Sequence, residues 1–174
     1  MGLLDMMGSA RPAKPEALSV PADSDAIHAP VSGRLVPLDQ IDDPAFARGM
    51  LGQGVGIRAR GDVAFSPVTG TVVADVKTKH ALLIRDEQGA EVLLHVGIDS
   101  VSLHGRGFRL FVRKGDRVCA GEPVIAFDRR LLEESGLDDT VIVTVTNSET
   151  FGPVEPVREA GEVAAGAVVL RAER

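Results

Sequence analysis

Apolar residues between positions 81 and 96 fall into two short runs on either side of a polar stretch. Ala81-Leu-Leu-Ile84 precedes the sequence Asp86-Glu-Gln-Gly89, and Val92-Leu-Leu94 follows it. Short aliphatic runs bounded by turn-forming residues are typical of β-strands, and Asp with Gly favours a tight turn between them. The pattern predicts a β-hairpin.

Aliphatic runs of similar length recur along the chain and are separated by Gly, Pro and Asp. Runs of this kind are too short for amphipathic helices, so they indicate further strands. The expected strands cover residues 55–60, 108–113, 122–127, 140–146 and 167–171.

Helical signals are few. Asp43 followed by Pro44 indicates an N-cap with proline at the first helical position. Residues 131–136 indicate one helical turn that ends at Gly136. The sequence therefore predicts an all-β fold, an antiparallel β-sandwich or barrel with one or two short helices.

One motif occurs twice, 37 residues apart. Residues 29–36 read Ala-Pro-Val-Ser-Gly-Arg-Leu-Val, and residues 66–73 read Ser-Pro-Val-Thr-Gly-Thr-Val-Val. Because proline cannot donate a hydrogen bond to a neighbouring strand, each copy is expected to open a strand or to lie at a sheet edge. The duplication favours two related β-units within one sandwich or barrel.

The predicted hairpin carries two histidines, His80 and His95. If its turn is centred on residues 87 and 88, paired residues have numbers that add up to 175, and the two histidines face each other. Directly opposed side chains have Cβ atoms roughly 4.5–5.5 Å apart. A slip of one residue would move the histidines to opposite faces. Paired imidazoles on an apolar face suggest nucleophilic chemistry near neutral pH.

Composition adds further limits. The chain has 174 residues, enough for one domain with a sizeable core. With six Phe and no Trp or Tyr, that core is expected to be aliphatic. The formal net charge is −6 and the sequence shows no local basic patch, so we expect no binding to nucleic acid.

The single cysteine, Cys119, excludes a disulfide framework and a cysteine-based zinc cage, and it fits a reducing cytoplasm. Its apolar surroundings predict a buried side chain. No apolar run approaches the roughly 18 residues that cross a bilayer. The N-terminus also lacks the charged region of a signal peptide.

Residues 1–25 differ from the rest of the chain, and we expect them to form a flexible segment that precedes a folded domain at 26–174. Proline at positions 12, 15 and 21 favours a tether. The apolar residues Leu3, Met6 and Met7 have helical spacing, so a short amphipathic helix is the alternative. Such a helix would contact a partner or, peripherally, a membrane surface.

Two other chemistries fit poorly. The spacing of His95 and Asp99 is half of a zinc-peptidase site, but the His-x-His pair that would supply the other ligands is missing. A zinc hydrolase is therefore the weaker alternative. Biotinyl and lipoyl carrier domains need a lysine at a hairpin tip, where this chain has Glu87 and Gln88.

Several segments together resemble the enzyme IIA components of the glucose family. These proteins belong to the phosphoenolpyruvate-dependent sugar phosphotransferase system (PTS). The resemblance covers approximately residues 26–172, and its centre is the sequence His-Val-Gly-Ile-Asp at 95–99. The matching segments are Ala29–Gly33, Gly52–Ile57, Pro67–Gly70, Lys79–Ala81, Gly89–Val101, Gly105–Phe108 and Phe127–Glu133.

The resemblance implies a phosphohistidine relay. The phosphocarrier HPr would phosphorylate His95, and the group would pass to a cysteine of a IIB domain during sugar uptake. His80 would be the partner histidine that stabilises the phosphoryl group, and Thr78 would orient His80. The backbone carbonyl of Gly97 would fix the tautomer of His95. The chain would thus be a phosphotransferase in the cytoplasm.

The resemblance also implies a docking surface and two further possibilities. A regulatory binding module, whose phosphorylation state controls transporters or metabolic enzymes, is the alternative function. No cofactor and no intrinsic metal is expected, although His80 and His95 would join a zinc ion in a complex with a target protein. The residues expected to contact partners are Asp43, Phe46, Val76, Leu82, Leu93, Val96, Ile98 and Asp99.

Overall fold

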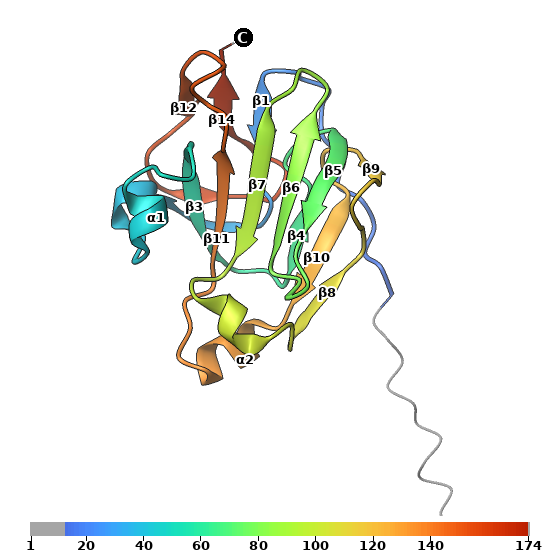
Figure 1. Ribbon diagram of the computed structural model, residues 1–174, viewed down its shortest axis with the longest axis vertical. Helices are drawn as coiled ribbons and strands as arrows, with labels where there is room; N and C mark the ends of the chain where they lie inside the picture. Colours follow the sequence, from blue (N-terminus) through green and yellow to red (C-terminus); the bar gives the residue numbers. More distant parts are fainter. Residues whose placement is uncertain (1–12, 174) are drawn as a thin grey trace, which may run out of the picture.

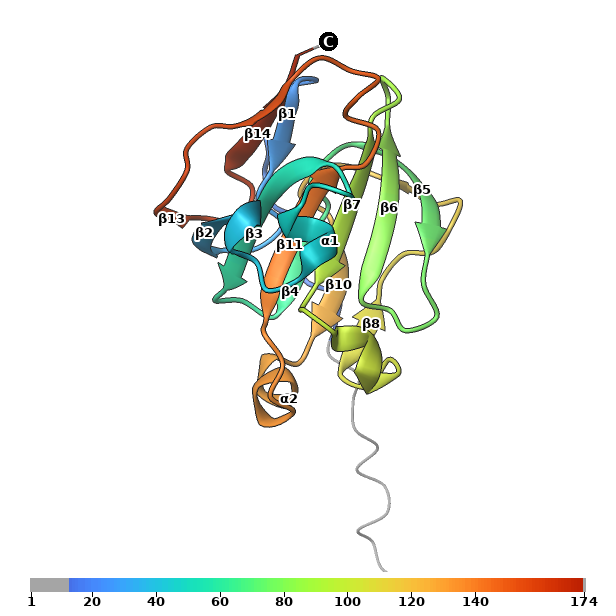
Figure 2. The same ribbon diagram turned by 60° about the vertical axis from the view of Figure 1, so that its left-hand side comes forward.

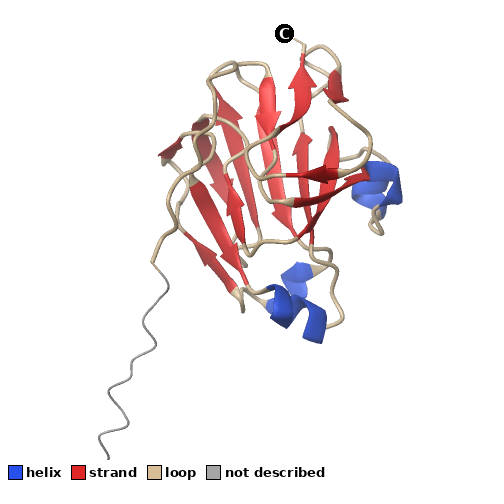
Figure 3. Ribbon diagram, turned by 180° about the vertical axis from the view of Figure 1, so that it is seen from behind, coloured by secondary structure: helices blue, strands red, loops and turns tan. Residues whose placement is uncertain are grey.

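The computed structural model describes residues 13–173. Most of the secondary structure is antiparallel β-sheet, as predicted, with two short α-helices (Figures 1 and 3). The helices are α1 (Pro44–Ala47) and α2 (Arg129–Glu134), and two short 3-10 helices are η2 (Leu38–Gln40) and η3 (Ser100–Leu103). The strands are β1 (Ala26–His28), β2 (Gly33–Pro37), β3 (Gln53–Ala59), β4 (Val63–Phe65), β5 (Gly70–Asp75), β6 (Ala81–Asp86), β7 (Glu91–Val96), β8 (Phe108–Leu110), β9 (Arg117–Val118), β10 (Pro123–Phe127), β11 (Thr140–Val145), β12 (Val154–Pro156), β13 (Glu162–Val163) and β14 (Val168–Ala172).

The strands form one large sheet and two small ones. The large sheet has the order β13-β2-β3-β11-β7-β6-β5-β9, and the small sheets have the orders β1-β14-β12 and β4-β10-β8. The main core lies between them, because it joins Ile57 and Leu94 of the large sheet to Ile125 and Leu170 of the small sheets. Its side chains are almost entirely aliphatic, in line with the scarcity of aromatic residues.

The repeated motif occupies equivalent places in two halves of this architecture. His28 N–H donates to the carbonyl of Pro67, and the residue equivalent to His28, Phe65, donates to the carbonyl of Pro30. This reciprocal exchange joins the two copies. β2 and β5, which the copies begin, each lie second from an end of the large sheet. The expected duplication is therefore visible in the fold.

The glycine of each copy allows the same close approach. A Cβ atom on Gly33 would lie 1.9 Å from the carbonyl oxygen of Arg58, and one on Gly70 would lie 2.1 Å from that of Arg85. Both distances are far inside van der Waals contact. Glycine is therefore needed where each motif meets the neighbouring strand of the large sheet.

The two α-helices begin at the expected kind of cap. Asp43 accepts a hydrogen bond from Ala45 N–H at 2.9 Å, with Pro44 at the first helical position of α1. α2 begins two residues earlier than predicted, because Asp128 caps it by accepting from Leu131 N–H. Gly136, with φ +70°, follows the end of this helix.

The segment before the domain differs from the expected tether in the part that the structure describes. Residues 13–25 contain no helix or strand, yet Leu18 N–H donates to the carbonyl of Gly121 at 2.9 Å. Asp23 also pairs with Arg171 at 3.0 Å. These contacts fix the segment against β14 and the turn before β10. The amphipathic helix considered for the first residues lies outside the described part of the chain.

Cys119 is exposed, not buried as expected. β9 ends at Val118, which takes the inward-facing position and is 1% exposed.

Among residues 13–173, no helix has the length and apolar character needed to span a membrane.

Candidate functional site

The hairpin of β6 and β7 forms as predicted, but its register differs by one residue. Ala81, not His80, is paired with His95, and Arg85 is paired with Glu91. The difference arises at the turn, where Gly89 adopts φ +96° and Asp86 N–H donates to the carbonyl of Ala90. The loop thus holds three residues, whereas we expected two. Three-residue hairpin loops commonly contain a glycine in the left-handed conformation.

The two histidines nevertheless lie together. The centroids of the His80 and His95 rings are 4.8 Å apart, with the ring planes at 81°. The expectation that a slip of one residue would separate them is wrong. His80 precedes the first residue of β6, and Lys79 before it has φ +61°, so the alternation of faces within the strand does not fix the direction of its side chain.

His80 is held by its own chain segment. Its carbonyl accepts a hydrogen bond from Val96 N–H at 2.8 Å, which joins it to β7. Its Nδ1 is hydrogen-bonded to the Thr78 hydroxyl at 2.9 Å. Only 8% of His80 is exposed. The contact with Thr78 fixes the ring and leaves Nε2 as the nitrogen available to a ligand.

His95 lies in a row of four aromatic rings. Its ring centroid is 5.1 Å from that of Phe46 on α1, and on the other side His80 is 6.4 Å from Phe108. The order along the row is Phe46, His95, His80, Phe108. Phe46 belongs to a small apolar cluster in which α1 and η2 cover the large sheet near β3 and β11 (Figure 2).

The Nδ1 atom of His95 is buried and has no hydrogen-bond partner among the described residues. Backbone atoms of Gly97 lie close enough to favour a proton on this ring, but the hydrogen bond of normal geometry that we expected is not formed. Because Nδ1 is inaccessible, Nε2 is the nitrogen of His95 that can react.

The turn after β7 keeps Gly97 near His95. Gly97 has φ +80°, and its N–H donates to the carbonyl of Thr140 at 2.9 Å. The hydroxyl of Ser100, which is fully buried, donates to the carbonyl of Val96 at 2.5 Å. Asp99 has φ +55° and lies at the surface. No pattern in the sequence indicated the part that Ser100 plays here.

Both imidazoles are kept neutral. The pKa of His95 is lowered to about 4, mainly by burial and also by the neighbouring His80, against the opposing effects of Gly97 and Asp43. Burial also lowers the pKa of His80, while a backbone group of Thr78 opposes the shift. At neutral pH, His95 therefore has a free lone pair, which is what a nucleophile requires.

This low pKa makes stability depend on pH. His95 in the unfolded chain binds a proton near pH 6.5, whereas in the folded protein it does so only near pH 4. Between these two pH values the unfolded state therefore binds more protons than the folded state. The free energy of unfolding consequently decreases as the pH is lowered. Between pH 7 and pH 5, we expect the wild type to lose about 1–2 kcal/mol more than His95→Gln. Urea unfolding of both proteins at each pH would measure this. Equal losses would contradict the burial of a neutral imidazole.

The residues expected to form the docking surface divide into two groups. Val76 is 37% exposed, Asp99 is exposed, and Leu93 and Asp43 are half-buried, so these four reach the surface. Phe46 and Ile98 are 2% and 5% exposed and support the site from beneath.

Leu82 and Val96 do not belong to this surface, which corrects our expectation. They are 1% and 0% exposed and lie in the main core on the other side of the sheet. The one-residue change in register pairs Leu82 with Leu94, whose side chain faces the core. Val96 follows His95 directly in β7, so its side chain points to the opposite face of the sheet. Two other large apolar residues, Val101 and Met50, are 52% and 72% exposed.

Residues 13–173 contain no group of three or more His, Cys, Asp or Glu side chains arranged to hold a metal ion. His80 and His95 supply two ligands, fewer than the three protein ligands of a catalytic zinc site. The zinc hydrolase therefore lacks support in the described residues, and zinc held jointly with a target protein stays a prediction.

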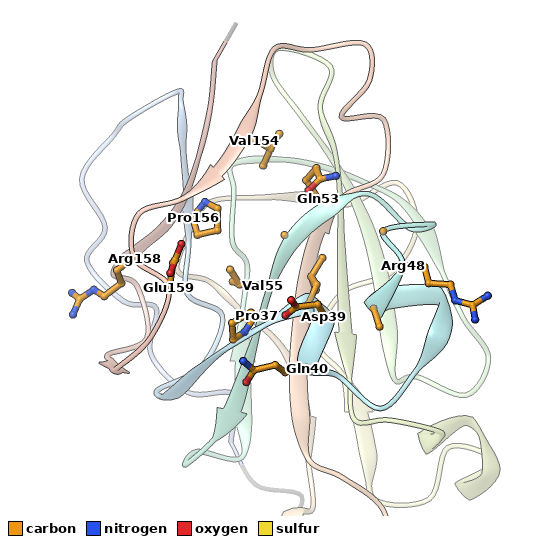
Figure 4. A pocket seen from close by; sticks show the side chains of 14 residues that line it. Pro37, Asp39, Gln40, Arg48, Gln53, Val55, Val154, Pro156, Arg158 and Glu159 are labelled. Atoms are coloured by element: carbon orange, nitrogen blue, oxygen red, sulfur yellow. The ribbon is translucent and has the colours of Figure 1, made fainter.

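A hollow of about 560 Å³ lies beside η2 and α1, and neither His80 nor His95 lines it. Its walls include Gln53 and Val55 of β3, together with Pro156 (Figure 4). The side chains of Arg48 and Arg158 point outward from it. Its polar groups do not converge on a common point, so it is a weaker candidate than the histidine pair.

Comparison with known proteins shows the family to which this chain belongs. A model of the family described as phosphoenolpyruvate-dependent sugar phosphotransferase system, EIIA 1, matches residues 25–151. The chain belongs to this family. EIIA proteins are phosphotransferase components of the PTS that carry the phosphoryl group on a histidine.

The EIIA chain is similar to curated proteins along most of its length. It is 36% identical to the glucose-specific EIIA component of Halalkalibacterium halodurans, over 95% of this chain and 94% of the relative. It is also 36% identical to the β-glucoside-specific EIIBCA component of Bacillus subtilis, over 90% of this chain but 25% of that protein. The chain thus spans about a quarter of this larger relative, whose name joins EIIA to B and C parts.

The fold agrees with a solved EIIA structure. The chain matches the glucose permease IIA from Mycoplasma capricolum with a TM-score of 0.72 and 34% identity. The match covers 83% of this chain and 93% of the other.

Proposed function

We propose that this EIIA chain relays a phosphoryl group from phospho-HPr, through His95, to a cysteine of a IIB domain during PTS sugar uptake. One observation carries the proposal: the rings of His95 and His80 lie 4.8 Å apart, and His95 is neutral at physiological pH. The relatives in which EIIA is joined to B and C parts support a IIB partner.

In the first step, Nε2 of His95 attacks the phosphorus of the phosphohistidine of HPr. A new N–P bond forms as the N–P bond of HPr breaks, and the leaving imidazole keeps its electron pair. Because His95 reacts as a neutral imidazole, no proton has to be removed from the attacking nitrogen. Burial of Nδ1 directs the reaction to Nε2.

In the second step, a IIB thiolate attacks the same phosphorus and His95 leaves as a neutral imidazole. Negative charge spreads over the equatorial oxygens during phosphoryl transfer, and a nearby hydrogen-bond donor stabilises it. His80 is placed to supply this donor from Nε2, because Thr78 occupies its Nδ1. The apolar rings of Phe46 and Phe108, which lie on either side of the two histidines, limit the access of competing water.

Removing the Thr78 hydroxyl should slow transfer to IIB without preventing phosphorylation of His95. We expect Thr78→Val to lower the transfer rate about 3–10-fold, the effect of one lost hydrogen bond of roughly 1 kcal/mol. Thr78→Ser keeps the hydroxyl and is the matched control. Quench-flow transfer to a IIB domain measures the effect. Equal rates for the valine and serine variants would remove Thr78 from the mechanism.

The surface around the histidines fits transient protein partners. The exposed Val76 lies at the turn before His80, and the half-buried Asp43 lies near His95. Apolar residues at the centre with charged residues around them are usual in such interfaces. HPr and IIB would contact this surface in turn. Both react inside the cell, so we place the chain in the cytoplasm.

The test is phosphorylation in a purified system. The wild-type chain is incubated with phosphoenolpyruvate, enzyme I and HPr, and its intact mass is measured. The proposal predicts the gain of one phosphoryl group that is lost in acid and that passes to an added IIB domain. A chain that gains no phosphoryl group would overturn it.

A further inference from the structure

Charged residues divide unequally between the two ends of the aromatic row. At the Phe46 end, Asp39, Asp42 and Asp43 lie on the segment that leads into α1. At the Phe108 end the charges are positive. There, Lys77 and Lys79 precede His80, and Arg106 precedes Phe108.

These cations lie together although the sequence separates them. A Cβ atom on Gly105 would lie 3.7 Å from the carbonyl oxygen of Lys77, so the loop before Phe108 packs against the turn before His80. Lys79 and Arg109 also line one hollow with Phe108. We call Lys77, Lys79 and Arg106 the basic cluster. The sequence showed no basic patch because the cluster forms only when the two loops meet.

The basic cluster is not neutralised by the rest of the domain. Its three residues are exposed, and among the described residues none forms an ion pair, whereas six arginines elsewhere do. Two acidic side chains near these loops already have hydrogen-bond donors: Asp75 accepts from Lys114 N–H, and Asp128 accepts from Leu131 N–H at the start of α2. Although the chain has a net charge of −6, these cations beside the site stay available to bind acidic groups of another protein.

We propose that the basic cluster binds acidic side chains of the protein that accepts the phosphoryl group, and so sets the orientation in which that acceptor docks. This inference rests on the proposed relay function. The acceptor attacks as a thiolate while His95 carries an anionic phosphoryl group, so its approach is opposed by like charges. Acidic residues on the acceptor that meet the basic cluster, with a basic group facing Asp43, would offset this repulsion.

The division of charge has a kinetic consequence. Charged residues at the edge of an interface act mainly on the association rate and on its salt dependence. A docking orientation turned by half a circle would bring like charges together at both ends of the row. The acceptor would therefore be selected by its charge pattern as well as by its apolar contacts.

Charge reversal tests the proposal. We expect Lys77→Glu/Arg106→Glu to lower kcat/KM for transfer to a IIB domain from the same organism about tenfold at low ionic strength. The effect should shrink to less than threefold at high salt, where a Debye length of about 3 Å screens surface charges. Phosphorylation by HPr should not fall. Both residues are exposed and outside strands, so the variant is expected to fold.

Arg158→Glu is the control, because Arg158 is exposed, unpaired among the described residues and points away from the domain (Figure 4). It should change kcat/KM less than twofold. Unchanged transfer in the double variant, with normal phosphorylation of the wild type, would overturn this inference alone. Loss of binding to phosphatidylserine vesicles, with unchanged transfer, would overturn it in favour of a membrane surface. A wild type that accepts no phosphoryl group would instead overturn the relay itself.

Discussion

His95→Gln should abolish phosphorylation by phospho-HPr. Glutamine has a similar size and keeps polar atoms in the site, but its amide nitrogen has no lone pair that can attack phosphorus. His80 should not replace it, because Thr78 holds its Nδ1 and, in the proposed donor role, its Nε2 carries the proton, so neither nitrogen offers a free lone pair. Intact-mass analysis after incubation with phosphoenolpyruvate, enzyme I and HPr should show an unmodified chain.

The control for this experiment is His104→Asn. His104 is exposed and has φ +53°, a conformation that asparagine tolerates. This variant should gain one phosphoryl group as the wild type does. Labelling that persists in His95→Gln would move the phosphorylated residue elsewhere. A circular dichroism spectrum like that of the wild type would show that the loss in His95→Gln is chemical and not a failure to fold.

The local features of the fold could be read from the sequence, because each depends on a few adjacent residues. Asp43 with Pro44 indicated the start of α1, and the polar stretch at 86–89 indicated the turn between β6 and β7. The two copies of the proline motif indicated the duplication, which the paired hydrogen bonds of Pro30 and Pro67 display.

The register of the hairpin could not be read in the same way. It depends on whether the loop holds two or three residues, and Gly89 permits either choice through its backbone conformation. The carboxylate of Asp86 stabilises the three-residue loop, because it accepts hydrogen bonds from Gln88 N–H and Ala90 N–H. The contact between the His80 and His95 rings was therefore predicted correctly, although the predicted pairing of the two residues was wrong.

The surface of the site was harder to predict than the contact between its two histidines. Resemblance to a family assigns residues by their place in a motif, and it does not say which side of a strand each one occupies. Leu82 and Val96 were placed at the surface for this reason and lie in the core. The basic cluster shows the converse, since its residues come from two loops whose contact no local pattern reveals.

His80→Gln should separate the two steps of the relay. Acceptance from HPr needs chiefly the lone pair of His95, so this variant should still gain one phosphoryl group. Transfer to IIB differs because the attacking thiolate is an anion that approaches an anionic phosphoryl group. The donor at Nε2 of His80 then matters most, and removing such a donor typically costs 10²–10³ in rate. We expect onward transfer to fall by about that factor.

The rate of transfer from phosphorylated His80→Gln to a IIB domain, followed by rapid quench, measures this prediction. Phe108→Leu is the matched control, because it alters packing against the outer face of His80 and leaves the imidazole in place. Its transfer should stay within about threefold of the wild type. Transfer from His80→Gln at the wild-type rate would mean that the second histidine is only a neighbour of the first. The loss of both steps would mean instead that His80 positions His95, as the close contact of their rings also permits.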